Sequence, residues 1–279
     1  MTQKVQHMTD QLFDLQGQVI VITGGGGVLP GALARGLAAR GAPVALLSRT
    51  LSKAEAVAAE IRAQGGRALA LATDVTDRAA LEAAAAQVLA EFGRVDHLIN
   101  GAGGHRPGAI AANGAAFFDL APEELRAVFD LNLMGSLLPA QVFGRLMAQQ
   151  GAGSILNISS VAAVRPLTRG VGYNAAKAAL TNLTQWLAVT FARDLGPGLR
   201  VNALAPGFYV GDQNRGLLLE PDGQLTARGQ TIIAHTPMGR FGDAADLLGA
   251  AIFLLSPAAR FVTGVVLPVD GGYLAYSGV

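Results

Sequence analysis

The 279-residue sequence contains no cysteine, and only 15% of its residues are charged. The absence of cysteine excludes disulfide bonds, a thiol nucleophile and cysteine-ligated metals. The 21 basic and 20 acidic side chains give a formal charge of +1, so the chain has no basic footprint for nucleic acid. Apolar residues make up 51% of the chain, which is ample for a large core and far from a disordered composition.

Long apolar runs and targeting signals are also missing. No uninterrupted apolar stretch reaches the roughly 18 residues that a membrane helix needs. Residues 1–16, which we expect to form an N-terminal extension, are polar and lack the apolar run of a secretory signal. The histidines have no partners at metal-ligand spacing. We therefore expect a cytoplasmic protein with no membrane partner, no nucleic-acid partner and no metal site.

Two hydrophobic periods alternate along the chain. Short apolar runs predict strands at 19–22, 44–47, 69–72, 97–99, 155–158, 200–204 and 265–269. Longer stretches rich in Ala and Leu predict helices at 31–40, 52–64, 77–92, 122–149, 173–195 and 243–255. Strands that are apolar on both faces are typical of parallel sheets covered by helices. The pattern predicts a single α/β domain over 1–279, a Rossmann-like, doubly wound parallel sheet of about seven strands with helices on both faces.

Two segments, 101–121 and 207–242, interrupt this alternation. Each follows the carboxyl end of a predicted strand, where open α/β sheets place their ligand crevice. Long irregular connections at such an edge are more often functional than accidental. We expect the segment 207–242 to form a lid over a bound substrate.

A glycine run at 24–27 joins the first predicted strand to the first predicted helix. Glycines let backbone N–H groups approach a phosphate, and the helix N-terminus adds positive potential, so the run favours dinucleotide binding over a structural turn. The second strand ends in Ser48 and Arg49, where a carboxylate would contact the adenosine ribose of NAD. Arg49 favours NADP by offering a partner for its 2′-phosphate, although a solvated arginine beside the adenine gives the same pattern.

Ser160, Tyr173 and Lys177 form the most informative group of polar residues. Tyr173 and Lys177 are four residues apart and share one helix face, so the ammonium can lie beside the phenol. A tyrosine with a pKa of about 10 is a poor acid or base at neutral pH, and a nearby cation lowers that pKa. Ser160, at the end of the fifth predicted strand, can hold a substrate oxygen.

With these motifs the chain resembles the short-chain dehydrogenase/reductase family over nearly its whole length. The resemblance implies a catalytic tetrad of Asn132, Ser160, Tyr173 and Lys177. In that family the tyrosine exchanges a proton with the substrate oxygen, which the serine positions. The lysine lowers the tyrosine pKa and contacts the nicotinamide ribose, and the asparagine holds a water in the proton relay.

The resemblance also implies the coenzyme contacts. The pair at 74–75 resembles the adenine contact, the turn at 100–103 supports the fourth strand, and the pair at 206–207 flanks the nicotinamide. Together with the residues above, the expected contacts are Thr23, Gly24, Gly25, Gly26, Gly27, Val28, Leu29, Ser48, Arg49, Asp74, Val75, Asn100, Gly101, Ala102, Gly103, Tyr173, Lys177, Pro206, Gly207 and Phe208.

The coenzyme motifs depart from the family pattern: Gly211 stands where a hydroxyl residue often follows the Pro-Gly pair, and two more departures lie in the turns after the first and fourth predicted strands. Val28 and Pro30 stand where the family has the second and third glycines of its first turn. We therefore expect the phosphate contacts to move to the glycines at 25–27 and to Leu29. Gly101 replaces the second asparagine of the family's usual Asn-Asn-Ala-Gly turn.

Several segments resemble the subgroup of D-mannonate oxidoreductases (fructuronate reductases), namely 23–31, 98–105, 185–189, 205–215, 234–242 and 270–279. That resemblance implies hydride transfer between a keto-sugar acid and an aldonic acid. An anionic, polyhydroxylated substrate needs a cation and several amide or hydroxyl partners. The candidate contacts are His105, Arg165, Asn214 and Arg215, with Arg106 and Gln213 beside them.

Two alternatives remain open. The same tetrad serves a reductase of a 3-oxoacyl chain or another hydrophobic ketone, which an apolar pocket would favour. A non-catalytic dinucleotide sensor or scaffold would be expected to have lost a member of the tetrad, and this chain has all four. The family resemblance also implies a homotetramer built through 122–149, 173–195 and the C-terminal segment.

Overall fold

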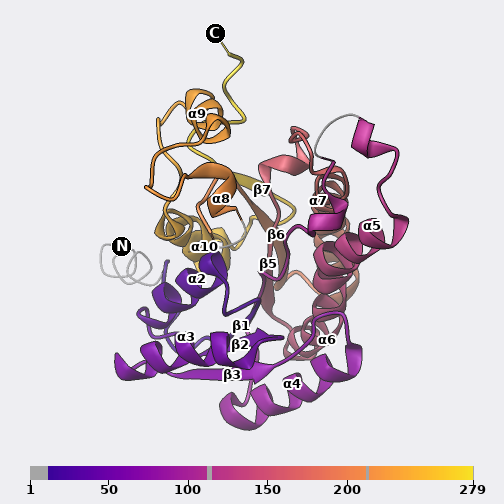
Figure 1. The fold of residues 1–279 in the computed structure, drawn as a ribbon. Coiled ribbons are helices and arrows are strands. Elements are labelled where there is room, and N and C mark those ends of the chain that lie inside the picture. The colour runs from indigo at the N-terminus through magenta and orange to yellow at the C-terminus, as the bar shows by residue number, and fades with distance from the viewer. Residues whose placement is uncertain (1–11, 112–114, 212–213, 279) are drawn as a thin grey trace.

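The centre of the molecule is one parallel sheet of seven strands in the order β3-β2-β1-β4-β5-β6-β7 (Figure 1). The computed structural model describes residues 12–111, 115–211 and 214–278. The strands are β1 (Ile20–Thr23), β2 (Val44–Ser48), β3 (Ala68–Ala72), β4 (His97–Asn100), β5 (Gly153–Ile158), β6 (Leu199–Pro206) and β7 (Val266–Val269). The predicted Rossmann-like α/β fold is thereby confirmed.

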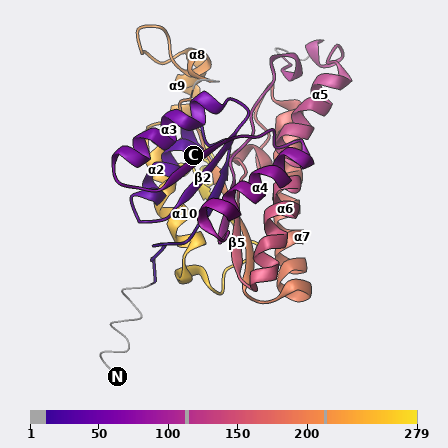
Figure 2. The same cartoon turned by 90° about the horizontal axis from the view of Figure 1, so that it is seen from below.

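Helices cover both faces of this sheet (Figure 2). One face carries α2 (Val28–Ala38), α3 (Leu51–Ala63) and α10 (Leu248–Leu255), and the other carries α4 (Arg78–Phe92), α6 (Gly135–Gln150) and α7 (Val171–Thr190). Ile20 and Ile22 pack into the core under the first set, whereas Val19 and Val21 pack into the core under the second. Successive strand side chains point to opposite faces, and this double burial is why the strand sequences are continuously apolar.

The helix expected at 122–149 contains an irregular turn. A π-helical segment, Asp130–Met134, separates α5 (Pro122–Phe129) from α6. Such turns are rare and occur frequently at functional sites, and this one carries Asn132. Tyr173 lies in the first turn of α7, which starts two residues before it. Among the helices that the structure describes, none is long and apolar enough to cross a membrane.

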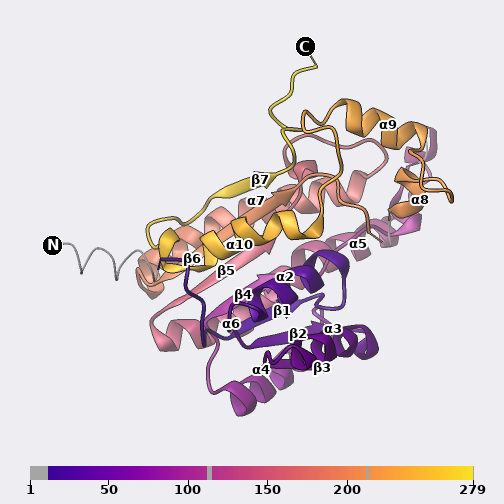
Figure 3. The same cartoon turned by 90° about the vertical axis from the view of Figure 1, so that its left-hand side faces the viewer.

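The order of strands reverses at β1, whose neighbours are β2 and β4. In open α/β sheets the ligand crevice lies at the carboxyl ends of the strands beside such a switch point. The segment 207–242, expected to be irregular, contains α8 (Arg215–Leu218) and α9 (Ala227–Ala234), which lie at the same end of the molecule as α5 (Figure 3). Thr226 caps α9, because its Oγ1 accepts a hydrogen bond from the amide of Gly229 at 3.0 Å.

Candidate active site

Three of the predicted catalytic side chains meet at the carboxyl end of β5. Ser160 comes two residues after this strand, and its Oγ accepts a hydrogen bond from the amide of Ala162 at 3.1 Å. A side-chain hydrogen bond joins Ser160 to Tyr173. Lys177 is buried, and its Nζ donates to the carbonyl oxygen of Ile158 at 2.7 Å. The same Nζ lies 5.7 Å from the centre of the Tyr173 ring.

Burial controls the protonation of these groups. It raises the pKa of Tyr173 above the ordinary 10.0, and the hydrogen bond with Ser160 lowers that pKa only in part. Burial also lowers the pKa of Lys177 to about 8. The sequence predicted a tyrosine pKa lowered by the ammonium, and this prediction is corrected here. Burial of the Tyr173 phenol away from water is the largest effect on its pKa, and the Lys177 ammonium donates its hydrogen bond to a main-chain carbonyl.

Asn132 is completely buried in the π-helical turn. Its Nδ2 donates to the carbonyl oxygens of Val128 at 2.8 Å and Gly104 at 2.9 Å, and its Oδ1 accepts from the Gly104 amide at 3.0 Å. A Cβ on Gly103 would lie 2.8 Å from this Oδ1 and 3.2 Å from Nζ of Lys177. Asn132 therefore ties the helix to the loop after β4, and its expected role in holding a water stays a prediction.

The glycine run packs tightly against two neighbouring elements. A Cβ on Gly25 would lie 2.8 Å from Cβ of Leu46 in β2, and a Cβ on Gly26 would lie 2.6 Å from Cβ of Lys53 in α3. Side-chain Cβ atoms do not tolerate such distances, so these positions require glycine. With no side chains at these positions, the backbone of the turn packs directly against β2 and α3 just before α2 begins.

Some backbone amides of this turn donate hydrogen bonds to residues that the structure describes, and others do not. Gly25 donates to the carbonyl of Leu47 at 3.1 Å, and Gly27 donates to the carbonyl of Gly24 at 2.8 Å. Two of the amides expected to contact phosphate are thus occupied within the protein. In the described part of the chain, the amides that have no protein acceptor include those of Gly26, Val28 and Leu29. Unpaired amides at a helix N-terminus form an anion-binding site.

Two of the departures from the family pattern fit one another. A Cβ on Gly101 would lie 2.6 Å from Cγ of Pro30 and 2.8 Å from the carbonyl oxygen of Thr23. Oγ1 of Thr23 accepts hydrogen bonds from the amides of Gly101 and Ala102, each at 3.1 Å. The proline ring therefore occupies the space that a side chain at position 101 would need, and the glycine makes room for it.

The end of β2 offers a cation to the adenosine side of the crevice. Arg49 is exposed, while Oγ of Ser48 accepts from the Thr50 amide at 3.2 Å. Asp74 accepts hydrogen bonds from the amide and hydroxyl of Thr76 at 2.9 and 2.7 Å. Burial raises the pKa of Asp74, but these bonds and the charge of Arg49 outweigh it and leave the pKa lowered.

His105, a predicted substrate contact, lies directly against Tyr173. Its ring stacks on that of Tyr173 with centroids 4.0 Å apart and planes inclined by 29°. Burial, followed by the charges of Lys177 and Arg228, lowers the pKa of His105 below its ordinary 6.5. The imidazole is therefore neutral at pH 7 and offers one hydrogen-bond donor and one acceptor.

Two other predicted contacts are engaged within the protein. Nη1 of Arg165 donates to the carbonyl oxygen of Tyr276 in the C-terminal segment at 2.8 Å. The amide of Asn214 accepts from the Gly211 backbone and donates to the Tyr209 carbonyl, both at 2.8 Å. These side chains therefore shape the tail and the loop before α8.

The remaining candidates differ in their surroundings. Arg106 pairs with Glu124 at 2.9 Å, whereas Arg215 is exposed at the start of α8. Gln213 lies outside the described residues. Sequence patterns did not point to Arg228 of α9, whose Nη1 donates to Oγ1 of Thr168 at 3.1 Å. The only local signal was the Thr226 cap, which marks a helix within the expected lid.

Comparison with known proteins decides the family. A family model described as enoyl-(acyl carrier protein) reductase matches residues 30–274. The chain belongs to the short-chain dehydrogenase/reductase family. The enzyme class expected from the sequence, an NAD(P)-dependent oxidoreductase that acts on CH–OH groups, is thereby confirmed.

Several members of the short-chain dehydrogenase/reductase family are similar over almost their full length. An uncharacterised oxidoreductase of Bacillus subtilis, UxuB, is 48% identical over 275 residues, covering 95% of this chain and 98% of the relative. The crystal structure of a proposed D-mannonate oxidoreductase from Haemophilus influenzae with bound NAD is 46% identical, with 95% and 98% coverage and a TM-score of 0.89. A gluconate 5-dehydrogenase from Burkholderia cenocepacia, in complex with NADP and tartrate, is 35% identical, with the same coverage and a TM-score of 0.85.

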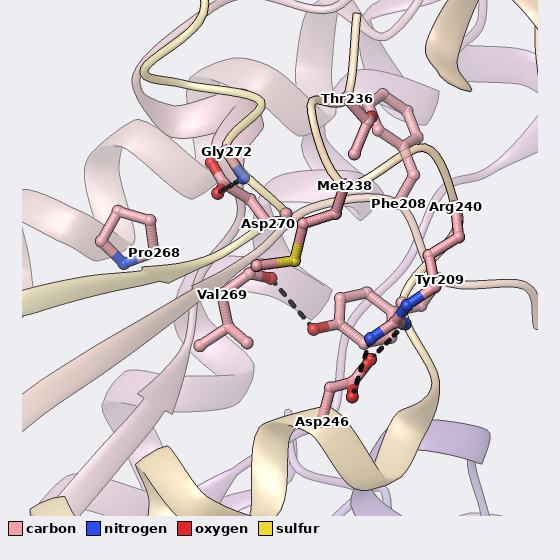
Figure 4. A pocket seen from close by; sticks show the side chains of 12 residues that line it. Phe208, Tyr209, Thr236, Met238, Arg240, Asp246, Pro268, Val269, Asp270 and Gly272 are labelled. Carbon is pink, nitrogen blue, oxygen red and sulfur yellow. Dashed lines mark hydrogen bonds and ion pairs between the residues drawn. The ribbon is translucent and has the colours of Figure 1, made fainter. Parts of the chain in front are cut away.

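A cavity of about 400 Å³ lies beside the carboxyl ends of β6 and β7 (Figure 4). Two of its polar contacts are internal: the Tyr209 hydroxyl donates to the Val269 carbonyl at 2.9 Å, and Arg240 pairs with Asp246 at 2.6 Å. Its lining consists of Phe208, Tyr209, Thr236, Met238, Arg240, Gly242, Asp246, Pro268, Val269, Asp270, Gly271 and Gly272. The predicted catalytic tetrad is not part of this lining, so the side chains around Tyr173, and not this cavity, form the candidate active site.

Proposed function

We propose that this enzyme transfers hydride between NAD(P) and a secondary alcohol or ketone of a sugar acid, of the D-mannonate/D-fructuronate type. The observation that carries the proposal is the arrangement around Tyr173. Its hydroxyl hydrogen-bonds Ser160, its ring stacks on neutral His105, and the cation Arg228 acts on that same imidazole. A polar, cationic surrounding suits an anionic, polyhydroxylated substrate better than a hydrophobic ketone.

The turn after β1 suits the coenzyme. The amides of Gly26, Val28 and Leu29 would hold its phosphates at the start of α2, where the helix dipole favours negative charge. Beside Lys177, position 103 is closely packed, since a Cβ there would lie 3.2 Å from Nζ and 2.8 Å from Oδ1 of Asn132. When bound, the nicotinamide accepts a hydride from the substrate carbon or donates one to it.

The side chains at the end of β5 move the proton. In the oxidative direction the substrate hydroxyl would transfer its proton to the deprotonated Oη of Tyr173 as the hydride leaves the same carbon. In the reductive direction the tyrosine proton goes to the carbonyl oxygen as the hydride arrives, so the charge balances in both. Ser160 holds the substrate oxygen, and Lys177 stays fixed beside them by its bond to the Ile158 carbonyl. The raised pKa of Tyr173 keeps its proton at neutral pH, which prepares this form to reduce a ketone.

Arg49 supports the use of NADP. It is an exposed cation at the end of β2, and no carboxylate stands at position 48 or 49 to oppose a 2′-phosphate. One similar structure carries NAD and another carries NADP. We infer that the crevice takes either coenzyme, with Arg49 favouring NADP.

The expected homotetramer stays a prediction. Trp186 and Val189 lie three residues apart on α7, and 60% and 58% of their surfaces are exposed. Residues with this spacing share one helix face. These two exposed apolar side chains are available for a contact between subunits.

The test follows nicotinamide absorbance while the purified enzyme meets D-fructuronate with NADH or with NADPH. We expect turnover, and we expect Tyr173→Phe to reduce kcat by roughly 10²- to 10⁴-fold because general acid catalysis is lost. Tyr209→Phe is the matched control, since its hydroxyl donates only to the Val269 carbonyl and its removal should leave kcat nearly unchanged.

Other outcomes lead to other conclusions. Turnover of 3-oxoacyl substrates in place of sugar acids would establish the hydrophobic-ketone alternative. Coenzyme binding without turnover of a broad panel of alcohols and ketones would favour a sensor. Full activity of Tyr173→Phe on D-fructuronate would remove the proposed mechanism.

A further inference from the structure

We propose that Arg228, on α9, is the specificity-determining residue that binds the carboxylate of an anionic substrate held at Tyr173. The inference rests on the proposed function and names the group that would select a sugar acid over a neutral polyol. It concerns substrate binding alone, because Arg228 takes no part in the transfer of hydride or proton.

The local structure of the lid fixes the position of Arg228. Thr226 caps α9 through the Gly229 amide, and its hydroxyl also donates to the carbonyl of Leu217 in α8 at 2.8 Å. Gly229 is buried and packs so closely against the carbonyl of Leu218 that a Cβ would not fit there. The first turn of α9, which carries Arg228, is therefore held directly against α8.

From this position Arg228 reaches across to the catalytic side. Its Nη1 donates to Oγ1 of Thr168 at 3.1 Å, and Thr168 belongs to the loop that joins Ser160 to Tyr173. The guanidinium is also close enough to His105 to lower the pKa of that imidazole. Since His105 stacks on the Tyr173 ring at 4.0 Å, the guanidinium and the phenol both lie near the same imidazole.

Arg228 differs from two other arginines near this end of the sheet. Arg106 is paired with Glu124 and Arg240 with Asp246. Within the described ranges Arg228 has no carboxylate partner, and the hydroxyl of Thr168 uses only one of its donors. A guanidinium has five donors in a planar fork that matches a carboxylate with two parallel hydrogen bonds. Arg228 is half-buried and has lost part of its hydration. A bound anion would replace the missing water as a hydrogen-bond partner of the guanidinium.

Comparing a charged with a neutral substrate shows whether Arg228 recognises the carboxylate or only holds the structure together. We expect Arg228→Gln to raise KM for the sugar acid about 10- to 100-fold, as expected for loss of a charge-assisted pair, while kcat changes less than about threefold. The kinetics of a neutral polyol, where one is accepted, should stay unchanged. Arg228→Lys should recover part of the affinity, because the charge is kept but the planar fork is lost.

Arg193→Gln is the matched control for the change in charge. Arg193 is exposed in the π-helical turn after α7, about 30 Å from the Tyr173 end of that helix at ~1.5 Å per residue. Its removal should alter neither KM nor kcat. Equal losses of kcat for charged and neutral substrates in Arg228→Gln would overturn the proposal, because they would indicate only a tether between the lid and Thr168.

Binding of tartrate separates this proposal from the proposed function. Calorimetry measures the affinity of tartrate for the enzyme saturated with coenzyme, whatever substrate is turned over. Affinity that falls about 10-fold or more in Arg228→Gln, but not in Arg193→Gln, would support the anion site even if no sugar acid is a substrate. Absence of binding in the wild type, or equal binding in all variants, would overturn it.

Discussion

The two sides of the crevice hold their functional side chains in different ways. On the catalytic side, Asn132 and Lys177 are buried and bonded to main-chain atoms. On the lid, Arg215 is exposed and Arg228 bonds only a threonine hydroxyl among the described residues. Proton transfer requires positions fixed to fractions of an ångström, whereas a long cationic side chain can meet a carboxylate over a wider range. The contrast therefore separates chemistry from recognition.

The segment 207–242 and the loop before α7 also show that residue type is a weak guide to recognition. Asn214 and Arg165 are as polar as Arg228, yet their donors are engaged by backbone carbonyls of the loop and the tail. Asparagine side chains readily bond nearby backbone groups in turns. A polar residue on such a loop can be assigned to a substrate only if its donors and acceptors are not already bonded to the protein backbone.

The largest effect that we expect from this contrast is on stability as a function of pH. The pKa of Lys177 is about 8 in the folded protein, against 10.5 as its ordinary value. Between these values the unfolded chain binds more protons, so the stability of the wild type should rise with pH relative to Lys177→Met. The full rise is on the order of 3 kcal/mol, measured by urea unfolding between pH 7 and pH 10.

The cation of the lid provides the control for this experiment. A guanidinium keeps its proton over the whole range, so the difference in stability between the wild type and Arg228→Met should not vary with pH. A flat difference for Lys177→Met as well would mean that its ammonium is not desolvated.

The next largest effect is expected from adding a methyl group at a glycine, on the catalytic side and on the side of α8. Gly103→Ala places a Cβ 2.8 Å from Oδ1 of Asn132 and 3.2 Å from Nζ of Lys177. We expect a stability loss of about 1–3 kcal/mol from overpacking, together with a clear fall in kcat. The same change at Gly216 in α8 meets nothing within 4 Å and should be nearly neutral. Thermal unfolding and turnover compare the two, and equal effects would break the contrast.

The smallest effect is expected at the exposed end of β2. Arg49→Gln should raise KM for NADPH about 10-fold by removing a charge-assisted contact to the 2′-phosphate. KM for NADH should change less than about twofold, since NADH lacks that phosphate. Arg40→Gln is a matched control, because Arg40 is exposed just beyond α2. Equal changes in KM for NADPH and NADH would show that Arg49 is only a solvent-exposed side chain and does not contact the 2′-phosphate.

Much of the catalytic side could be predicted from local patterns. The strand runs at 19–22 and 155–158 and the spacing of Tyr173 and Lys177 are short-range signals, and the structure places them at one edge of the sheet. The π-helical turn at 130–134 gave no such signal, because it interrupts a helix whose apolar period continues through it. The coupling of Pro30 with Gly101 was also hidden, since it joins two motifs that are far apart in the chain.

The sequence by itself determined the kind and order of the strands and helices, the glycine turn and the placing of Tyr173 and Lys177 on one helix face, because each depends on patterns among near neighbours in the chain. The tertiary structure alone decided which polar side chains remain available. Arg228 meets a hydroxyl 60 residues away, whereas Arg165 meets a carbonyl 111 residues away. Burial likewise set the pKa of Tyr173 and of Lys177, because the loss of water around a group depends on everything that packs against it.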